Sequence, residues 1–356
     1  MEHSFNWEKV KTRFEALWQG EIIDRCCAAV LAPMGDTSKS RRLPSNPKDL
    51  IRFRTDGEWV LKRNLENLEK TYFAGDAIPI IVPDIGAAGH AGFFRGAKYH
   101  LENTVWYFPS IEEWAPDSIH FDKDSFLFRK TLELTQYLAD ESKGRYFVAM
   151  PDISGNMDAL AHLRGSENLL VDILVDPEPV KDALDKIQKV WKQTIDQLYD
   201  IVRDTNQGGS CVGWLYTWAP GLHCQMSSDI SAMLSPESFQ EFVYPELMEQ
   251  SNHLDFPLYH MDGSQQTRYL EMLCSIENLK MIQWTQVPGQ PSPIHFISTF
   301  KKIQAAGKNL LLQTNPKDVE FLMENLSSKG LYLVVHTQNK EEADCVINRI
   351  AQLTHD

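Results

Sequence analysis

The sequence predicts an α/β protein of the (β/α)8 TIM-barrel type, built as a single domain. Two observations support this fold class. Short apolar runs of strand length alternate with segments of helical spacing along all 356 residues, and this alternation is typical of parallel α/β folds. Polar and aromatic residues stand where several of the runs end, which is where barrel enzymes carry their active sites.

Eight runs have the length and composition of strands. In chain order they are Cys27–Ala32, Ile78–Val82, Tyr146–Met150, Cys211–Tyr216, Leu258–Met261, Met281–Trp284, Asn309–Gln313 and Leu331–His336. Apolar residues three and four apart lie between them, for example in Val180–Val202 and Phe239–His253. A helix from Trp7 to Trp18 lies outside the strand count, in an N-terminal helical extension over residues 1–25 of a domain that spans 1–356.

Two helix starts carry capping signals. Ser235-Pro236 and Asp176-Pro177 each place proline at the first helical position after a capping side chain. A doubly wound open sheet is the competing fold, and it normally has a glycine-rich phosphate turn after an early strand. The stretch Gly86-Ala87-Ala88-Gly89 resembles such a turn only loosely, because its glycines lack the dinucleotide spacing. The barrel is therefore favoured.

Composition excludes several classes of function. Hydrophobic residues make up 43% and charged residues 24% of the chain, as in globular proteins. The net charge of −14 argues against a nucleic-acid partner, because affinity for phosphates depends on Lys and Arg. No apolar run approaches the ~18 residues that span a bilayer, and the six cysteines are scattered. We expect a cytoplasmic enzyme with no membrane partner.

The run Pro257–Gly263 contains a histidine and a carboxylate two residues apart, His260 and Asp262. Side chains at i and i+2 of a strand point to the same face, so this pair projects from one strand end. With His336 from the last strand it could hold zinc, because three protein ligands and one open position form a catalytic zinc site. The alternative is a hydrogen-bonded structural histidine.

Two aspartates follow other strands. Asp152 comes after Met150 and Asp84 after Val82, and each is either a catalytic carboxylate or a turn residue. Three aromatic residues alternate along the fourth predicted strand and would share one face as a ligand-stacking wall or as core packing. They are Trp214, Tyr216 and Trp218.

Further candidates for substrate binding lie in one loop and at two more strand ends. Cys224 and Asp229 belong to a loop that we expect to line the site, with a nucleophilic cysteine as another possibility. Gln283, Trp284 and Gln313 end the sixth and seventh predicted strands. Together with the aspartates and histidines they would form one binding site suited to a polar, planar ligand.

Seven stretches of the chain resemble one family as a set. They are Phe73–Pro79, Thr104–Trp106, Asp152–Asp158, Leu163–Gly165, Met233–Phe239, Tyr259–Gly263 and Ile282–Trp284. From about Phe73 to the C-terminus the sequence resembles the uroporphyrinogen decarboxylase superfamily, nearer its cobalamin-dependent methyltransferase branch. The resemblance implies a TIM barrel.

In that branch, the resemblance implies, a His-x-Cys after strand five and a later cysteine hold zinc, which activates a thiol to accept a methyl group from methylcobalamin. His260 matches the family histidine, Asp262 stands at the position of the first cysteine, and His336 lies near the last. The decarboxylase branch needs an arginine-rich segment after strand one. The residues here, Leu31–Asp36, are apolar and acidic, so porphyrinogen decarboxylation is disfavoured.

The sequence thus predicts a methyltransferase that moves a methyl group between a corrinoid and a small acceptor or donor, where the corrinoid is methylcobalamin carried on a partner protein. Zinc would sit at His260, Asp262 and His336, with Asp152 and Asp84 beside the substrate. One alternative is a metal-free decarboxylase or lyase acting on a small carboxylate, with either aspartate as acid or base. Another is a binding protein that kept the barrel without the chemistry.

Overall fold

The structure is a computed structural model that describes residues 6–35, 44–102 and 104–356. Residues 1–5 of the predicted N-terminal extension, and Asp36 in the segment compared with the decarboxylases, lie outside the described residues. Within this described part, no helix is both long and apolar enough to cross a membrane.

A seven-stranded sheet forms the centre of the fold, in the order β2-β1-β13-β12-β11-β10-β9. Its strands are β1 (Cys27–Pro33), β2 (Thr71–Gly75), β9 (Gln225–Met226), β10 (Leu258–Asp262), β11 (Met281–Thr285), β12 (Asn309–Thr314) and β13 (Leu331–His336). All of them run parallel except β2, which is antiparallel to β1.

In the described part of the chain, six further strands lie outside this sheet. They are β3 (Ile80–Ile81), β4 (Lys98–Leu101), β5 (Val105–Phe108), β6 (Phe147–Val148), β7 (Ser210–Val212) and β8 (Thr217–Ala219). β3 and β6 pair in parallel, whereas β4–β5 and β7–β8 are antiparallel pairs. The ladders leave β3–β6 separate from the large sheet. The α/β class is therefore confirmed, while a closed eight-stranded barrel is not shown.

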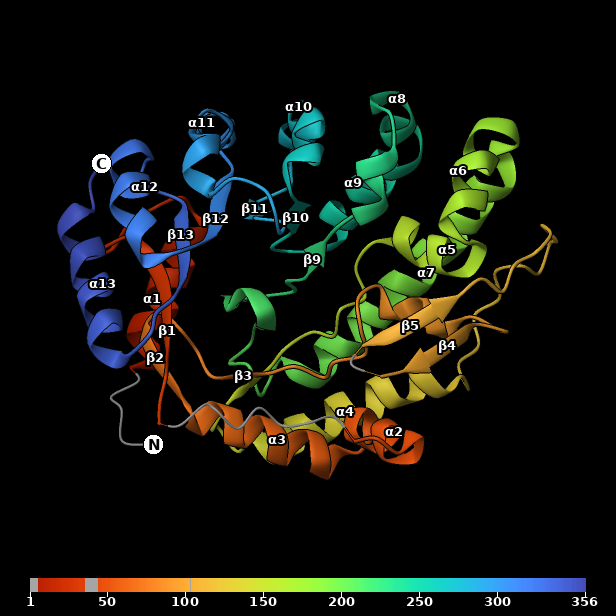
Figure 1. The fold of residues 1–356 in the computed structure, drawn as a ribbon, viewed down its shortest axis with the longest axis horizontal. Helices are drawn as coiled ribbons and strands as arrows, with labels where there is room; N and C mark the ends of the chain where they lie inside the picture. Colours follow the sequence, from red (N-terminus) through yellow and green to blue (C-terminus); the bar gives the residue numbers. More distant parts are fainter. Residues whose placement is uncertain (1–5, 36–43, 103) are drawn as a thin grey trace.

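Helices surround the strands. The longer ones are α1 (Trp7–Trp18), α2 (Pro47–Thr55), α3 (Gly57–Glu69), α4 (Phe126–Ser142), α5 (Asn156–Arg164), α6 (Ser166–Val175), α7 (Pro177–Val202), α9 (Tyr244–His253), α11 (Ile297–Ala305) and α13 (Lys340–Leu353). Shorter ones are α8 (Pro236–Ser238), α10 (Leu270–Ser275) and α12 (Val319–Asn325). Helices α9 to α13 lie along the outer side of the large sheet (Figure 1).

The predicted strands and caps can be compared with these bounds. Each of the eight predicted strands overlaps a strand of the structure, and the last four agree to within one residue at each end. The Ser235 cap is present, since its side chain accepts from the Ser238 N–H at 3.1 Å. Asp176 precedes α7 but makes no side-chain cap bond.

The fourth predicted strand, Cys211–Tyr216, is wrong beyond Val212. The chain enters a 3₁₀ turn at η2 (Gly213–Leu215), Tyr216 takes a left-handed φ of 53°, and β8 folds back antiparallel on β7. On the side of β10 that faces away from β11, the parallel neighbour is instead β9, a strand of two residues that is too short to show any periodicity.

The core has two parts because the strands are buried on both faces. Residues 259, 261, 282 and 284 face the helices, whereas residues 258, 281, 311 and 332 belong to an inner cluster. Helix α1 completes the inner cluster with Phe14, Leu17 and Trp18. The inner cluster therefore fills the sheet near the starts of its strands and leaves the strand ends for other residues.

Candidate functional site

Polar side chains replace apolar ones along the inner face of three neighbouring strands. Leu258, Met281 and Leu311 lie in the inner cluster, and the residues two positions further along are His260, Gln283 and Gln313. The register pairs His260 directly with Gln283. Because strand alternation keeps i and i+2 on one face, the carboxyl ends of β10, β11 and β12 present a polar surface. The predicted place of the site is thus where polar residues gather.

His260 is held in one orientation by its neighbour on β11. Its Nδ1 lies 2.5 Å from Gln283 Oε1, while Gln283 Nε2 donates to Thr285 Oγ1 at 2.7 Å. An amide oxygen only accepts hydrogen bonds, so Nδ1 carries the imidazole proton. This arrangement leaves Nε2 of a neutral His260 as a proton acceptor. The indole of Trp214 meets the imidazole edge to face, with ring centroids 5.0 Å apart.

A directed chain of hydrogen bonds runs from Trp214 to Asp152. The indole N–H donates to Gln225 Oε1 at 2.5 Å, and Gln225 Nε2 donates to Ser154 Oγ at 2.9 Å. Ser154 Oγ then donates to Asp152 Oδ1 at 2.8 Å. An indole is a donor only, so the direction of the chain follows from its first member. Asp152 is oriented as the final acceptor.

Several carboxylates influence one another around His260. Burial raises the pKa of Asp152; the hydrogen bonds from Ser154 oppose this rise, as would a protonated His260, and the charge of Asp84 adds to it. Loss of solvent likewise raises the pKa of Asp229, with His260 opposing and Asp262 adding. These mutual effects place the five groups in one region. A raised carboxyl pKa favours a protonated form that can give up its proton during a reaction.

Asp229 is positioned by another carboxylate. Asp158, from α5, accepts the backbone N–H of Asp229 at 2.9 Å and that of Ile230 at 2.7 Å. Burial raises the pKa of Asp158 to about 7, and the neighbouring Asp229 charge adds to the rise. The helix that follows the Asp152 loop therefore also fixes the Asp229 loop.

Asp84 differs from Asp152 in its partners. It forms an ion pair with the buried guanidinium of Arg54, and its Oδ1 accepts the Gly86 N–H at 3.0 Å. Within the described part of the chain, Asp152 has no ion-pair partner. Asp152 is accordingly the better placed of the two predicted acid/base residues, and Asp84 is the turn residue of the alternative interpretation.

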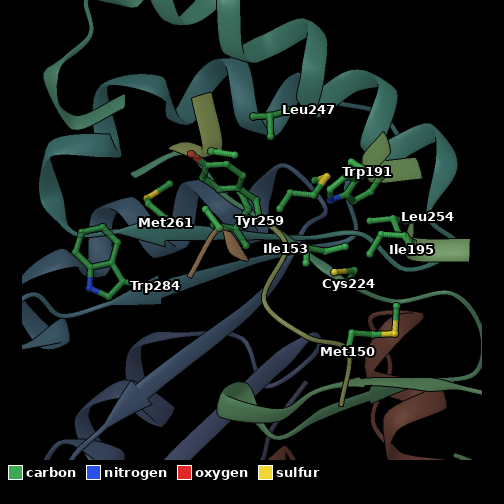
Figure 2. Close-up of a cluster of buried hydrophobic side chains, with 14 of the residues drawn as sticks. Met150, Ile153, Trp191, Ile195, Cys224, Leu247, Leu254, Tyr259, Met261 and Trp284 are labelled. Carbon is green, nitrogen blue, oxygen red and sulfur yellow. The ribbon is translucent and has the colours of Figure 1, made fainter. Parts of the chain in front are cut away.

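Three predicted substrate-binding residues lie away from this surface. Trp218 is buried in the inner cluster, where its N–H donates to Asn206 O at 2.8 Å. Trp284 points to the opposite side of β11 from Gln283 and packs on aromatic side chains of the helix layer. Cys224 is enclosed by apolar side chains, and Figure 2 shows it with Trp284 in that hydrophobic cluster. Burial raises the pKa of Cys224 to about 12, so its thiol is not a nucleophile at neutral pH.

The remaining predicted residues lie at the edge of the polar surface formed by the strand ends. Gln313 Nε2 donates to Trp214 O at 3.3 Å. Tyr216 and His336 face each other with ring centroids 6.3 Å apart, and burial lowers the pKa of His336. Tyr216 is fixed by the Tyr332 hydroxyl, which donates to its carbonyl at 2.7 Å. Trp214, Tyr216 and Trp218 therefore do not share one strand face, since the backbone turns between them.

The three predicted zinc ligands do not assemble into one group. His260 and Asp262 leave β10 together, but β13 with His336 is separated from β10 by two strands. Residues 6–35, 44–102 and 104–356 contain no group of three or more His, Cys, Asp or Glu side chains with metal-binding geometry. The residues present thus do not fit a three-ligand zinc centre. Zinc therefore remains a prediction.

Sequence reasoning missed five polar residues that shape the site. These are Arg54, Ser154, Asp158, Gln225 and Thr285. Ser154 and Asp158 stand in the segment Asp152–Asp158, which the family resemblance had marked, and Thr285 continues the alternation of β11. Arg54 gave no signal, because it comes from a helix 30 positions before its partner.

Comparison with known proteins adds one observation. No family matches the sequence, and no curated protein is similar to it. Among solved structures, the fold is similar to that of a methyltransferase from Methanosarcina mazei, with a TM-score of 0.61 and 11% sequence identity. The alignment covers 96% of this chain and 98% of that chain. At this identity the similarity shows the fold alone.

Proposed function

We propose that this protein is a methyltransferase that moves a methyl group between a corrinoid and a small acceptor. The fold is similar, over nearly the full length of both chains, to that of a protein described as a methyltransferase. The polar side chains stand at the carboxyl ends of parallel strands, the usual place of an active site in α/β proteins. The corrinoid would be methylcobalamin, free or carried on a partner protein.

His260 would act as the base of this reaction. Its Nδ1 proton is directed at Gln283, which leaves Nε2 to take a proton from the acceptor. A bound methylcorrinoid supplies an electrophilic methyl group and keeps the electron pair of the broken bond. The acceptor, a thiol or an amine, forms the new bond to carbon with its own electron pair. His260 with its fixed tautomer is the observation that carries this proposal.

The charges of the site indicate the class of small acceptor. Asp152 and Asp229 interact electrostatically with His260, Asp262 interacts with Asp229, and Arg54 is already paired with Asp84. These carboxyl groups provide no cation for an anionic acceptor and would repel it when ionised, whereas they tolerate a neutral molecule and would attract a cationic one. We therefore expect an uncharged thiol or an amine.

The test is the demethylation of methylcobalamin, followed by its absorption spectrum, with a panel of thiols and amines. We expect turnover with at least one neutral or cationic acceptor, a loss of turnover in His260→Gln, and wild-type turnover in Cys345→Ser, a matched control on exposed α13. The proposal fails if no acceptor in the panel is methylated, with or without added zinc and a corrinoid protein.

A metal-free decarboxylase or lyase is the second candidate, favoured by the raised pKa of Asp152. A protonated carboxyl beside a substrate can deliver the proton that replaces a lost carboxylate. Release of CO₂ from a panel of small carboxylates, abolished in Asp152→Asn, would favour this candidate over methyl transfer. If neither reaction occurs but a small ligand raises the melting temperature, the third interpretation, a binding protein, is supported.

A further inference from the structure

A buried polar cluster lies beside the candidate site, among α5, α7 and α9. Glu246 and Gln250 come from α9, Gln188 from α7 and Asn156 from the first position of α5. All four side chains are buried. Asn156 Nδ2 donates to Gln188 Oε1 at 2.5 Å, and Gln250 Nε2 donates to Glu246 Oε1 at 3.0 Å. The cluster thus connects three helices away from the polar strand ends.

Two oxygens of this cluster lack a donor. Glu246 Oε1 accepts two bonds, from Gln250 Nε2 and from the Asn156 N–H at 2.9 Å. Glu246 Oε2 and Gln250 Oε1 are buried without any partner among the described residues. If Glu246 were ionised, its charged Oε2 and the neutral Gln250 Oε1 would both be buried without a hydrogen-bond donor. Such unsatisfied acceptors are costly in a protein interior. One proton on Oε2 resolves both, because it can be donated to Gln250 Oε1.

We propose that Glu246 is a neutral carboxylic acid that donates its proton to Gln250 Oε1 and, in this form, positions Asp152 and Asp229. The acid and the amide then form a cyclic pair with two hydrogen bonds. Three further buried nitrogens, on His90, Gln188 and Trp191, also have no hydrogen-bond partner within residues 6–35, 44–102 and 104–356, but they are not needed for this pairing.

The link to the site runs through α5. The N-cap of α5, Gly155, has no capping side chain, and Glu246 takes that role by accepting the Asn156 N–H. Asp152 lies four residues before this position, and Asp158 in the first turn of α5 holds the Asp229 loop. A displaced Glu246 would therefore shift both carboxylates. This positioning role rests on the proposed function of the site, whereas the proton on Glu246 does not.

The charged groups around Glu246 come from several elements. Asp158 on α5 repels its charge, Tyr259 faces it from β10, and His90 reaches it through Asn156. Burial lowers the pKa of His90 to about 3, so this imidazole is neutral. Between α7 and α9, the exposed pair Lys192–Glu249 lies at the surface.

The same burial raises the pKa of Glu246 to about 8 from an ordinary 4.5. The folded protein then holds a proton that the unfolded chain has lost. Stability from this group is fully present below about pH 4.5 and decreases as the pH rises towards about 8.

Glu246→Gln tests the proposal, because its amide mimics the neutral acid and donates to Gln250 without titrating. We expect the ratio of the wild-type to the variant unfolding constant to rise about tenfold per pH unit between about pH 5 and 8. At pH 6 the wild type should show a carboxylic acid carbonyl band from Glu246 that Glu246→Gln lacks, and the difference spectrum separates it from the band of Asp158, whose pKa burial raises to about 7. Asp158→Asn serves as a control, since it removes the neighbouring carboxyl and leaves that band.

Hydrogen exchange tests the positioning role. In Glu246→Ala, amides of residues 152–158 and 229–230 should exchange faster than in the wild type, and Glu246→Gln should restore the wild-type rates. Neither the infrared nor the unfolding measurement needs turnover, so their result is separate from the fate of the proposed reaction. A difference spectrum between the wild type and Glu246→Gln that lacks a carboxylic acid band, or a ratio of unfolding constants independent of pH, would overturn the proton assignment. Unchanged exchange in Glu246→Ala would overturn the positioning role.

Discussion

The carboxylates at the two ends of the parallel strands differ in whether a cation neutralises them. At the amino end, the buried carboxylate of Asp76 is bound by Arg13 at 3.0 Å and by Arg25 at 2.7 Å, and it accepts the Ala28 N–H at 2.9 Å. At the carboxyl end, Asp152 accepts a neutral hydroxyl and has no cation in the described chain within ion-pair distance.

This difference distinguishes a carboxylate with a structural role from one that belongs to the candidate site. A buried carboxylate with full compensation is stable in its charged form and holds its neighbours in place. A partly buried carboxylate without a cation is destabilised in its charged form, which raises its pKa. Groups with such perturbed pKa values are concentrated at functional sites. The amino end of the strands is thus the structural end, and the carboxyl end is the candidate site.

The largest effect is expected for Asp152→Asn. The amide keeps the size of the side chain and its bond to Ser154 but cannot transfer a proton, so turnover by the decarboxylase or lyase candidate, in which Asp152 is the acid, should fall by about 10²–10⁴-fold. Stability at pH 7 should not fall, because the change removes a carboxylate that burial disfavours. Steady-state kinetics and urea unfolding measure the two quantities. A large loss of stability with normal turnover would reverse the assignment of this end.

Asp76→Asn is the converse change at the other end. It leaves Arg13 and Arg25 buried without their counter-charge, and the expected cost is about 3–5 kcal/mol of unfolding free energy. Urea unfolding measures the loss. Asp24→Asn is the matched control, because Asp24 also pairs with Arg13 but is partly exposed, and exposed pairs contribute about 0–1 kcal/mol. Equal effects of the two variants would contradict the contrast between paired and exposed charge.

A smaller effect is expected for Cys224→Ala. The side chain lies in the hydrophobic cluster, so the change should cost about 1 kcal/mol of stability and leave turnover unchanged. Since burial raises the pKa of Cys224 to about 12, the native protein should not be alkylated at this thiol, while exposed Cys345 should be. Mass spectrometry after iodoacetamide treatment distinguishes them. Rapid labelling of Cys224 would return it to the site.

The smallest effect is expected for the zinc content of the protein. Because His260, Asp262 and His336 do not gather into one group, we expect less than one zinc per chain after reconstitution and no change in zinc content in His260→Ala. Elemental analysis by mass spectrometry measures both. One zinc per chain that is lost in His260→Ala would establish the metal centre that the family resemblance implies.

Local pattern predicted much of this molecule. The apolar runs at Leu258–Met261 and Leu331–His336 were found nearly to the residue, because burial on both faces requires continuous apolar sequence. Strand alternation also predicted that His260 and Asp262 leave one face together. The helix from Trp7 to Trp18 was identified outside the strand count, and its contact with the inner cluster explains its apolar residues.

The errors have a common cause. Trp218, Trp284 and Cys224 stand at strand ends or in a loop in the sequence, yet they are buried in the two cores. For Trp218, the chain reverses through a 3₁₀ turn that begins at Gly213 and ends at a left-handed Tyr216, and the sequence prediction continued the strand through this glycine. For Trp284, the alternation that brought Gln283 inward turned the indole outward. The position of a residue in the sequence indicates how far along a strand it lies, but not on which face of the sheet its side chain is buried.

The sequence by itself determined the α/β class, most strand positions and the end of the sheet where polar chemistry gathers, because these follow from burial and from the two-residue repeat of a strand. Only the tertiary structure decided which polar residues meet. The series of hydrogen bonds from Trp214 through Gln225 and Ser154 to Asp152 joins segments that are separate in the sequence. Glu246 likewise reaches the start of α5 from 90 residues away. Such contacts depend on how helices and strands pack, which no local pattern encodes.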